Sequence, residues 1–357
     1  MNLGIIGLPQ VGKKTVFDIL TGIAPEKAPR KAGVAYGVAP VRDPRIDRLS
    51  AMYQPRRTRY AEFEIALPPD LVPNSSRSAE WLDPLRQVDA FIHVIRAFDS
   101  PTAFHLLGEV DPERDLATVE TELLFADLEL VEKRLQRMAK ENRGTADPAK
   151  DREKSLLEKF RQHLEAEKSL RTFEVAGDDR KIVDNLQFMT LKPLIAVFNC
   201  SDEFPEREGA QRYRHLAEIL RENGAEVLFM NAEIEQEISQ LEPGEQLEFM
   251  RELGIEEPAA HRLSRAAYQS LGLLSFFTVG PDEVRAWPLR QGATAPEAAG
   301  RIHSDLARGF IRAETIAYEQ LNEAGSEKAA KAANLFRLNG KDYIVKDGDI
   351  LNIRFNV

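Results

Sequence analysis

Residues 7–15, GLPQVGKKT, have the composition and spacing of a loop that binds phosphate. Glycines let the backbone approach an anion closely, the amide N–H groups of such a loop donate to phosphate oxygens, and a lysine neutralises the phosphate charge. The full pattern, G-x-x-x-x-G-K-[ST], ends on a hydroxyl that binds Mg²⁺. Gly7, Gly12 and Lys13 match this pattern, but Lys14 stands at the hydroxyl position. The residues therefore predict a phosphate site that lacks one metal ligand.

Lys14 cannot replace the hydroxyl, because a protonated lysine has no lone pair for a metal and repels a cation. Thr15 carries a hydroxyl, but one step along a helix turns a side chain by about 100°. Thr15 is therefore a weak candidate for the metal, and the alternative for the whole segment is a tight turn that binds nothing. The residues expected at the nucleotide phosphates are Gly7, Gln10, Val11, Gly12, Lys13, Lys14 and Thr15.

A second motif, Asn199, Cys200 and Asp202, follows an apolar strand and keeps the spacing N-x-x-[DE]. Proteins that bind guanine nucleotides use N-K-x-D, in which the acid reads the guanine edge and the lysine stem covers the ring. Asp202 favours guanine, whereas Cys200 in place of the lysine favours adenine. ATP and GTP both stay open, with a weak preference for ATP; the alternative is that Asn199 only caps a turn. A further loop expected at the base contains Asn231, Ala232 and Glu233.

The elements around these motifs predict an α/β fold. An apolar strand at 3–6, the loop, and a helix at 13–20 give the strand–loop–helix order that a phosphate loop requires. Strands and helices alternate through much of the chain, which favours a doubly wound, mostly parallel sheet. Further strands are expected at 63–67, 90–95, 194–198 and 227–230, and helices at 212–222 and 259–271.

Two regions depart from this alternation. Residues 117–190 contain two charged helical stretches separated by RGTADPAK, which is typical of an antiparallel helix pair. Residues 274–357 carry 11 Lys and Arg against 11 Asp and Glu, so this small α+β module lacks the basic surface of a general nucleic-acid binder. Its expected strands lie at 276–279, 284–287, 343–345 and 350–355, with a helix near 295–303.

Composition narrows the classes of function. The 357 residues suffice for two or three domains, and the net charge of −10 argues against wholesale coating of nucleic acid, so no DNA is expected as a partner. The single cysteine excludes a disulfide framework, and the six histidines have no ligand-like spacing. Because no window has the 18 or more apolar residues of a membrane span and no signal peptide is evident, we expect a cytoplasmic protein without a membrane partner.

The longer motifs resemble the YchF family, the Obg-like P-loop ATPases. The resemblance is carried by GLPQVGKKTVFDILTG, VAPVRDPRIDRLS, DAFIHVIRAFD and TELLFADLELVEKRL, and most specifically by the C-terminal runs FFTVGPDEVRAWPLRQGATAPEAAG and NGKDYIVKDGDILNIRFNV. It covers the whole chain. It implies a P-loop nucleotide-binding domain at 1–116 and 191–273, a helical coiled-coil insertion at 117–190, and a ubiquitin-like TGS domain at 274–357.

The resemblance also marks departures at the metal and switch positions. Glu64 stands where the family has an aspartate, and Leu67 and two prolines replace a glycine-rich segment. Residues 22–37 contain no Ser or Thr, so a second hydroxyl for the metal is missing. Glu64 is a weak metal candidate and is otherwise a solvated acid. His105 lies where the family has a histidine linked to hydrolysis, although a histidine beside apolar residues is more often structural.

Three functions remain open at this point. The first is a YchF-like protein that binds ATP or GTP, hydrolyses it weakly or not at all with Mg²⁺, and acts as a ribosome- or RNA-associated regulatory factor. The second is an active ATPase or GTPase, and the third is a scaffold that binds no nucleotide. Ribosome or RNA association is implied by the resemblance, through the TGS domain and the helical arm. Basic candidates for that contact are Arg56, Arg57, Arg59, Lys133, Arg134, Arg137 and Lys140, although charged helices are usually only solvated.

Overall fold

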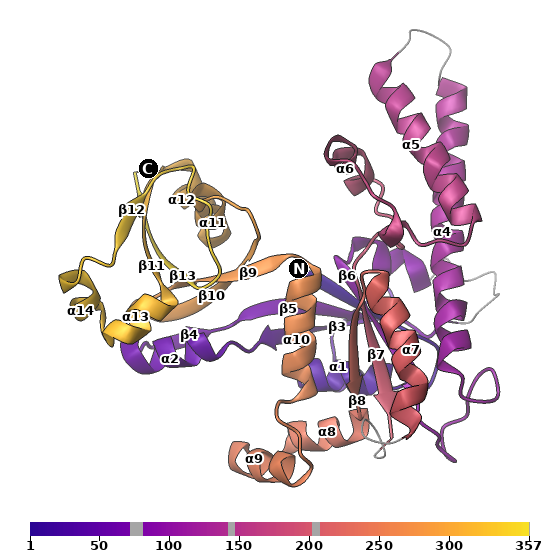
Figure 1. The fold of residues 1–357 in the computed structure, drawn as a ribbon, viewed down its shortest axis with the longest axis horizontal. Coiled ribbons are helices and arrows are strands. Elements are labelled where there is room, and N and C mark those ends of the chain that lie inside the picture. The colour runs from indigo at the N-terminus through magenta and orange to yellow at the C-terminus, as the bar shows by residue number, and fades with distance from the viewer. Residues whose placement is uncertain (72–80, 142–146, 202–207, 357) are drawn as a thin grey trace. The chain divides into compact units, whose positions relative to one another are not determined.

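The computed structural model describes residues 1–71, 81–141, 147–201 and 208–356 (Figure 1). These residues form two compact units. The first comprises residues 1–38 and 64–263, and the second comprises residues 39–63 together with residues from 264 to the C-terminal end. Each unit is built around its own sheet.

The described part of the first unit is built on a seven-stranded sheet in the order β2-β3-β5-β1-β6-β7-β8. The neighbours β5, β1, β6, β7 and β8 pair in parallel, whereas β2 and β3 pair antiparallel. The expected mostly parallel α/β fold is therefore confirmed. The strands are β1 (Asn2–Ile6), β2 (Arg30–Lys31), β3 (Val34–Val41), β5 (Ala61–Leu67), β6 (Ala90–Ala97), β7 (Leu194–Cys200) and β8 (Glu226–Met230).

Continuous apolar sequence explains the centre of this sheet. Every residue of β7 is buried, as are the first seven of β6, because a parallel strand in the middle of such a sheet is covered on both faces. Apart from the long helix pair between residues 112 and 165, which we call the helical arm, this unit has the helices α1 (Lys13–Thr21), α7 (Glu208–Glu222), α8 (Ala232–Gln240), α9 (Pro243–Glu252) and α10 (Ala259–Ser270). Helix α10 continues into the second unit. A short 3₁₀ helix, η1, spans Asp83–Gln87.

A long helix pair extends from the same unit. Helix α4 (Pro112–Glu141) has 30 residues, and α5 (Pro148–Glu165) runs back alongside it (Figure 1). The two helices bury an apolar seam that includes Val131 and Phe160, and η2 (Leu170–Thr172) and α6 (Gly177–Asp184) follow. Across the described residues, every helix is too short or too polar to span a bilayer.

A buried carboxylate fixes the base of this arm. Asp127 of α4 is fully buried, and its oxygens accept hydrogen bonds from the backbone N–H groups of Met189 (2.8 Å) and Thr190 (2.7 Å) and from the Thr190 hydroxyl (2.7 Å). Burial raises the pKa of Asp127, while these three bonds act in the opposite direction. The segment that leads into β7 is thus tied to the arm.

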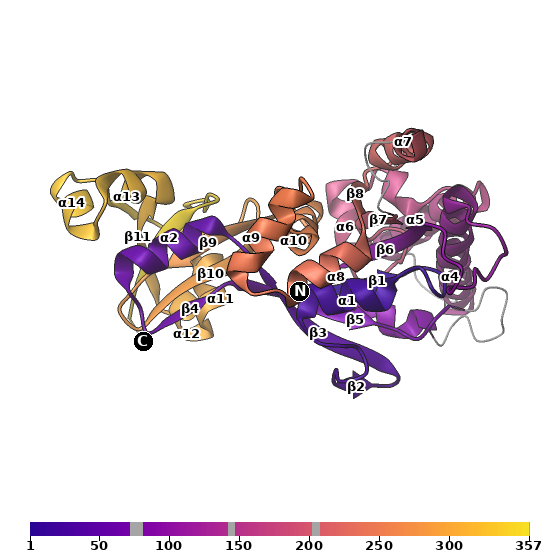
Figure 2. The same ribbon diagram turned by 90° about the horizontal axis from the view of Figure 1, so that it is seen from below.

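The second unit contains a six-stranded sheet among its described residues, in the order β12-β11-β13-β9-β10-β4. Its edge strand β4 comes from the N-terminal half of the sequence and lies beside β10 (Figure 2). The two strands pair in parallel, with Arg57 opposite Glu283. The ion pair of Arg45 with Asp347 (2.6 Å) likewise joins residues 39–63 to the C-terminal part of this unit. The strands are β4 (Arg57–Arg59), β9 (Leu273–Thr278), β10 (Glu283–Arg290), β11 (Phe310–Ala317), β12 (Arg337–Asn339) and β13 (Asp349–Phe355).

One predicted strand in this unit is wrong. Residues 343–345 form no strand, and Ile344 makes a single bridge to Thr294. Ala295 N–H donates to the Tyr343 carbonyl and Val345 N–H donates to the Ala293 carbonyl, so this segment pairs with the start of a helix rather than with a strand. The helices of the unit are α2 (Pro44–Tyr53), α11 (Ala295–Ile302), α12 (Ser304–Arg308), α13 (Tyr318–Ala324) and α14 (Glu327–Ala332).

Asp127→Ala is expected to lower the free energy of unfolding by about 3 kcal/mol, because it leaves two buried N–H donors without acceptors. Urea or thermal denaturation measures the loss. Glu129→Ala is the matched control, because Glu129 lies on the same helix in an exposed pair with Lys133 and should cost less than about 1 kcal/mol. Equal losses in the two variants would contradict the bracing role of Asp127.

Candidate functional site

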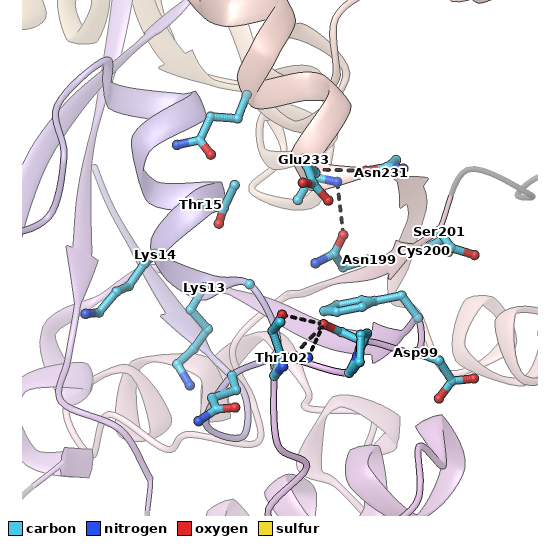
Figure 3. Close-up of a pocket in the computed structure, with 18 of the residues that line it drawn as sticks. Lys13, Lys14, Thr15, Asp99, Thr102, Asn199, Cys200, Ser201, Asn231 and Glu233 are labelled. Atoms are coloured by element: carbon cyan, nitrogen blue, oxygen red, sulfur yellow. Dashed lines mark hydrogen bonds between the residues drawn. The ribbon is translucent and has the colours of Figure 1, made fainter.

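A cavity of about 1060 Å³ lies in the first unit where the parallel strands β1, β6, β7 and β8 end (Figure 3). Ligands of open α/β sheets bind at this carboxyl edge. The cavity brings together four segments that are far apart in the sequence, at 10–15, 98–103, 199–201 and 231–236, together with Asp70. The predicted site residues that line it are Gln10, Gly12, Lys13, Lys14, Thr15, Asn199, Cys200, Asn231, Ala232 and Glu233.

The backbone of the phosphate-type loop requires glycine at two positions. Gly7 has φ +141°, and a Cβ placed there would lie 2.4 Å from the carbonyl oxygen of Val94 in β6. Gly12 has φ +102°, and a Cβ there would lie 2.4 Å from Nδ2 of Asn199. Both positions combine a left-handed backbone with a close neighbour, so a side chain is excluded twice over.

The ammonium group of Lys13 is buried and fully bonded. Its Nζ donates to the carbonyl oxygens of Gly7 (2.7 Å) and Leu8 (2.5 Å) and lies 2.8 Å from a carboxylate oxygen of Asp70. Burial lowers the pKa of Lys13, and Asp70 partly offsets this effect. A lysine ammonium has three N–H donors, so these three acceptors use all of them.

Lys14 differs from Lys13 in its exposure and in its partner. The Lys14 side chain is 68% exposed and lies 3.2 Å from a carboxylate oxygen of Glu26, and the two lysine side chains leave α1 in different directions (Figure 3). Thr15 lines the cavity one residue further along the helix. The hydroxyl position of the loop is thus taken by an ammonium group that faces solvent.

Asn199 connects two loops of the cavity. Its Nδ2 donates to the carbonyl of Val11 (3.0 Å), and its Oδ1 accepts from the backbone N–H of Ala232 (3.0 Å). The side chain is 5% exposed, so both bonds are made in a nearly dry environment. Asn199 therefore holds the loop after β1 against the loop after β8.

The neighbours of Asn199 are also held by internal contacts. The thiol of Cys200 is buried, which raises its pKa to about 12, so it is a packing group rather than a nucleophile. Asn231 caps α8, its Oδ1 accepting from the N–H groups of Glu233 (3.0 Å) and Ile234 (3.2 Å). Gln236 of the same helix donates to Asp18 of α1 (2.7 Å) and fixes the spacing of the two helices.

Some predicted residues lie elsewhere. Gly7 and Val11 belong to the loop but do not line the cavity, and Val11 is buried beneath it. Asp202 lies outside the described residues. Glu64 lies opposite Asn2 in the parallel pairing of β5 with β1, at the end of β1 that is far from the loop. This exposed acid therefore lies away from the phosphate site, and we correct the prediction that it could be a metal ligand.

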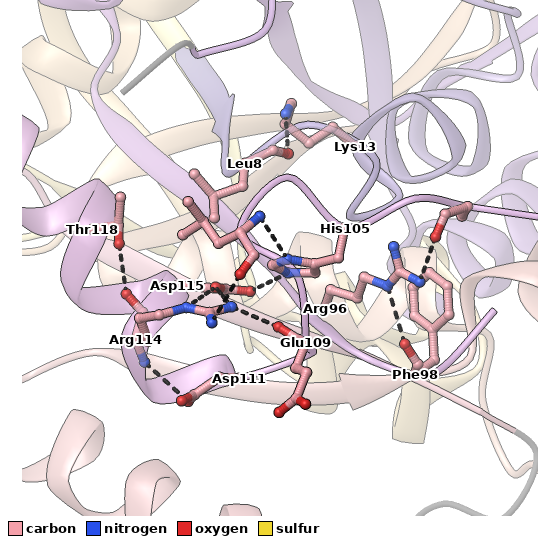
Figure 4. Close-up of polar contacts among 12 residues, drawn as sticks. Leu8, Lys13, Arg96, Phe98, His105, Glu109, Asp111, Arg114, Asp115 and Thr118 are labelled. Atoms are coloured by element: carbon pink, nitrogen blue, oxygen red, sulfur yellow. Dashed lines mark hydrogen bonds and ion pairs between the residues drawn. The ribbon is translucent and has the colours of Figure 1, made fainter. Parts of the chain in front are cut away.

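His105 belongs to a separate network beside the cavity (Figure 4). Its Nδ1 accepts from the N–H of Leu107 (3.1 Å), which places the ring proton on Nε2, 2.7 Å from the Asp115 carboxylate. Arg114 also donates to Asp115 (2.9 Å) and to the backbone carbonyl of Glu109 (2.6 Å). These contacts give His105 a positioning role in the loop after β6; its catalytic role stays a prediction.

Sequence reasoning missed two parts of the cavity wall. Asp70, three residues beyond β5, contacts Lys13, and the loop at 98–103 closes another side. The second part is held by Arg96, which is buried and donates to the carbonyls of Phe98 (3.0 Å) and Ala103 (2.9 Å). A signal for both exists, because each segment directly follows a strand of the parallel sheet at its carboxyl end.

The described residues do not form a complete Mg²⁺ site. No group of three or more His, Cys, Asp or Glu side chains among them could hold a metal ion. Mg²⁺ prefers oxygen ligands, yet position 14 presents an ammonium group and the Asp70 carboxylate is bound to Lys13. At a nucleotide, Mg²⁺ takes only one or two protein oxygens besides phosphate and water. In the arrangement described, neither position 14 nor the Asp70 carboxylate offers it a free one.

Comparison with known proteins gives matches over the full length. Residues 273–356 match the family model YchF-GTPase_C, described as "Protein of unknown function (DUF933)". The "Ribosome-binding ATPase YchF" of Bacillus subtilis (strain 168) is 40% identical over an alignment of 371 positions, which covers 100% of both chains. The protein of that name from Escherichia coli O157:H7 is 39% identical over 99% of both.

A plant relative and a solved structure extend the match. "Obg-like ATPase 1" of Oryza sativa subsp. japonica is 34% identical, covering 100% of this chain and 92% of its own. The solved "Structure of the Schizosaccharomyces pombe YchF GTPase" superposes with a TM-score of 0.85 at 30% identity, over 99% of this chain and 97% of that one.

Asn199→Asp is expected to lower the free energy of unfolding by about 2–4 kcal/mol at neutral pH, because a carboxylate oxygen would face the Val11 carbonyl in a buried position. Burial raises the pKa of such a carboxyl above its unfolded value. The deficit should therefore shrink as the pH falls and the protonated acid donates to that carbonyl. Denaturation of variant and parent at matched pH measures this.

Asn185→Asp is the matched control for that substitution. Asn185 also donates from Nδ2 to a backbone carbonyl, that of Lys181 (3.0 Å), but it is exposed. Its loss should stay below about 1 kcal/mol and show no recovery at low pH. A deficit at residue 199 as small as that of the control would contradict the bracing role of Asn199.

Proposed function

The chain belongs to the YchF family, and from this premise we propose that it binds a nucleoside triphosphate in the cavity beside residues 7–15 and acts as a ribosome-associated regulatory factor. One observation carries the nucleotide proposal: the loop with its two obligatory glycines, the buried Lys13 and the brace Asn199 meet at one cavity. Amide groups at a helix N-terminus favour anions, and Lys13 adds a full positive charge.

The proposed base is adenine in preference to guanine. The lysine that covers a guanine ring in N-K-x-D is replaced by Cys200, whose buried thiol cannot cover a base in the same way. Three of the relatives above are named ATPases, although the solved relative is named a GTPase. The preference for ATP is accordingly weak, and the expected base contacts are Cys200, Asp202 and the segment 231–233.

The proposed hydrolysis is weak or absent. Phosphoryl transfer depends on a metal that neutralises developing charge. Position 14 carries an ammonium group in place of the metal-binding hydroxyl, and the Asp70 carboxylate is paired with Lys13. An active ATPase is the second candidate, favoured by the oxygens of Thr15 and Asp70, which both line the cavity. Turnover of ATP with Mg²⁺ at a rate typical of an enzyme would select the second candidate.

The proposed partner is the ribosome, reached through the helical arm and the C-terminal TGS domain. Support comes from the relatives named ribosome-binding and from exposed basic side chains on α4, including Lys133, Arg137 and Lys140. Arg134 contributes less, because its guanidinium donates to the Glu153 carboxylate of α5 (2.7 and 3.1 Å). We place the protein in the cytoplasm on the same grounds and expect no DNA partner.

Calorimetric titration of nucleotide-stripped protein with ATP, ADP, GTP and GDP, each with Mg²⁺ and with EDTA, tests the nucleotide proposal. Binding of ATP that survives EDTA is the expected result, because the phosphate contacts come from backbone amides and lysines. The absence of binding by all four nucleotides would leave only the fold of a nucleotide-binding protein and overturn the proposal.

Lys14→Ser is expected to weaken ATP binding in EDTA by about threefold to tenfold, because an ammonium group near the phosphates partly replaces the metal charge in the parent protein. The same variant restores the hydroxyl of the full motif, so its affinity for ATP should rise when Mg²⁺ is added. Calorimetry in the two buffers measures both effects. Unchanged affinity in EDTA would contradict this use of Lys14.

Reversing the charge of Lys133, Arg137 and Lys140 to glutamate is expected to reduce co-sedimentation of the protein with ribosomes several-fold, because contacts to phosphate groups dominate such affinity. The control reverses three exposed arginines of α7 and α9, Arg214, Arg221 and Arg251, which changes the net charge equally. Equal losses for both variants would assign the effect to net charge and contradict a specific role of the arm.

A further inference from the structure

The Lys13 ammonium group, which a phosphate-binding loop uses to bind phosphate, already has an anionic partner in this structure. Two of its three donors go to carbonyls of its own loop, and the third faces the carboxylate of Asp70 at 2.8 Å. Lys13 is 5% exposed whereas Asp70 is 54% exposed. The cation is therefore fixed inside the wall of the cavity, and the anion reaches it from the solvent side.

The position of Asp70 resembles that of a phosphate oxygen. In a phosphate-binding loop the lysine that follows the second glycine reaches the β- and γ-phosphates, so a bound triphosphate needs a donor of Lys13. All three donors are in use, and Asp70 lines the same cavity. The two carbonyls belong to the loop itself, whereas Asp70 comes from the segment after β5 and is half exposed, which makes it the partner that can leave.

We propose that Asp70 is an internal competitor for the phosphate site, and that nucleotide binds by displacing its carboxylate from Lys13. This inference rests on the proposed nucleotide function and names a residue that sets the affinity of that site. A carboxylate beside a phosphate repels it, so Asp70 must move away from Lys13 unless a divalent cation bridges the two anions. Asp70 thereby makes metal-free binding weaker than the loop and Lys13 alone would allow.

Because Lys13 is buried, the competition between the Asp70 carboxylate and a phosphate for its ammonium group is strong. Burial also decides the pH at which this competition should be tested. A buried ammonium without a counter-ion is costly, so in the empty protein Asp70 supplies the charge that burial demands. Removing Asp70 leaves Lys13 in need of an anion, which a phosphate group can supply. Because burial lowers the pKa of Lys13 and Asp70 opposes this, the comparison is made at matched pH values at and below neutrality, since lower pH favours the ammonium form.

The test is calorimetric titration of the full chain and of Asp70→Asn with ATP, GTP and inorganic triphosphate, in EDTA so that no divalent cation can bridge two anions. Asp70→Asn should bind ATP and inorganic triphosphate about tenfold more tightly than the parent, since a hydrogen bond to a charged group is removed from the competing state. Adenosine, which has no phosphate to reach Lys13, should show no such gain.

Asp99→Asn is the matched control. Asp99 lines the same cavity and the substitution removes the same charge, but among the described contacts its carboxylate has none with Lys13. Its effect reports the general loss of negative charge near the cavity and should be clearly smaller than that of Asp70→Asn, because exposed charges are screened by salt.

The outcomes separate the two proposals. Equal affinity of parent and Asp70→Asn for ATP would overturn the competitor role and leave the nucleotide function standing. Tighter binding of inorganic triphosphate by Asp70→Asn, with neither protein binding ATP or GTP, would support the competitor role and overturn the nucleotide function. Gains of equal size in Asp70→Asn and Asp99→Asn would overturn the specific role of Asp70, and no binding of any probe to either protein would overturn both proposals.

Discussion

The amide group of Asn199 supports the geometry of the whole cavity. Its two bonds, to the Val11 carbonyl and from the Ala232 N–H, span the loop after β1 and the loop after β8. The Gln236–Asp18 hydrogen bond joins the helices that follow these two loops. Because the Asn199 amide comes so close to residue 12, only a glycine fits there. One buried amide thus fixes the path of the loop after β1, and through that path it sets where Lys13 enters the cavity wall.

The second determinant is the balance of charge around two adjacent lysines. Lys13 is buried and bonded within its own loop and to Asp70, whereas Lys14 is exposed beside Glu26. A complete phosphate loop has one lysine and one hydroxyl at these positions, so that a metal ion can share the phosphate charge. In this chain a second ammonium group takes the hydroxyl position. Under the proposed function, the protein rather than a bound ion would supply the charge needed by a triphosphate. Lys14 in place of the Ser or Thr of the full motif is therefore the reason why we propose that hydrolysis is weak or lost.

Local patterns predicted the part of the structure that depends on local physics. The apolar runs of β6 and β7, and the glycines with the lysine of the loop at 7–15, were placed correctly because burial and backbone conformation act over a few residues. The sequence did not predict the contact of Asp70 with Lys13, and it placed Glu64 too close to the phosphate site. Both depend on the register between β5 and β1, which decides which acid of the β5 segment lies beside the loop and which cannot be read from the sequence alone. The edge strand β4 was missed because it is only three exposed residues, RTR, whose pairing with β10 spans more than half the chain. Residues 343–345 have the apolar composition of a strand but pair with the start of a helix. The periodicity of a sequence does not predict such a partner.

Hydrogen–deuterium exchange of the nucleotide-free protein, with and without ATP in EDTA, tests the central claim that nucleotide binds at this cavity. The account predicts that ATP slows amide exchange in peptides covering residues 7–21 and in those covering 196–201 and 231–240, because the loop amides take phosphate oxygens as acceptors and the Asn199 brace transmits the ordering to α8. Exchange that stays unchanged in all three segments at saturating ATP, or protection confined to the arm or to the second unit, would contradict it.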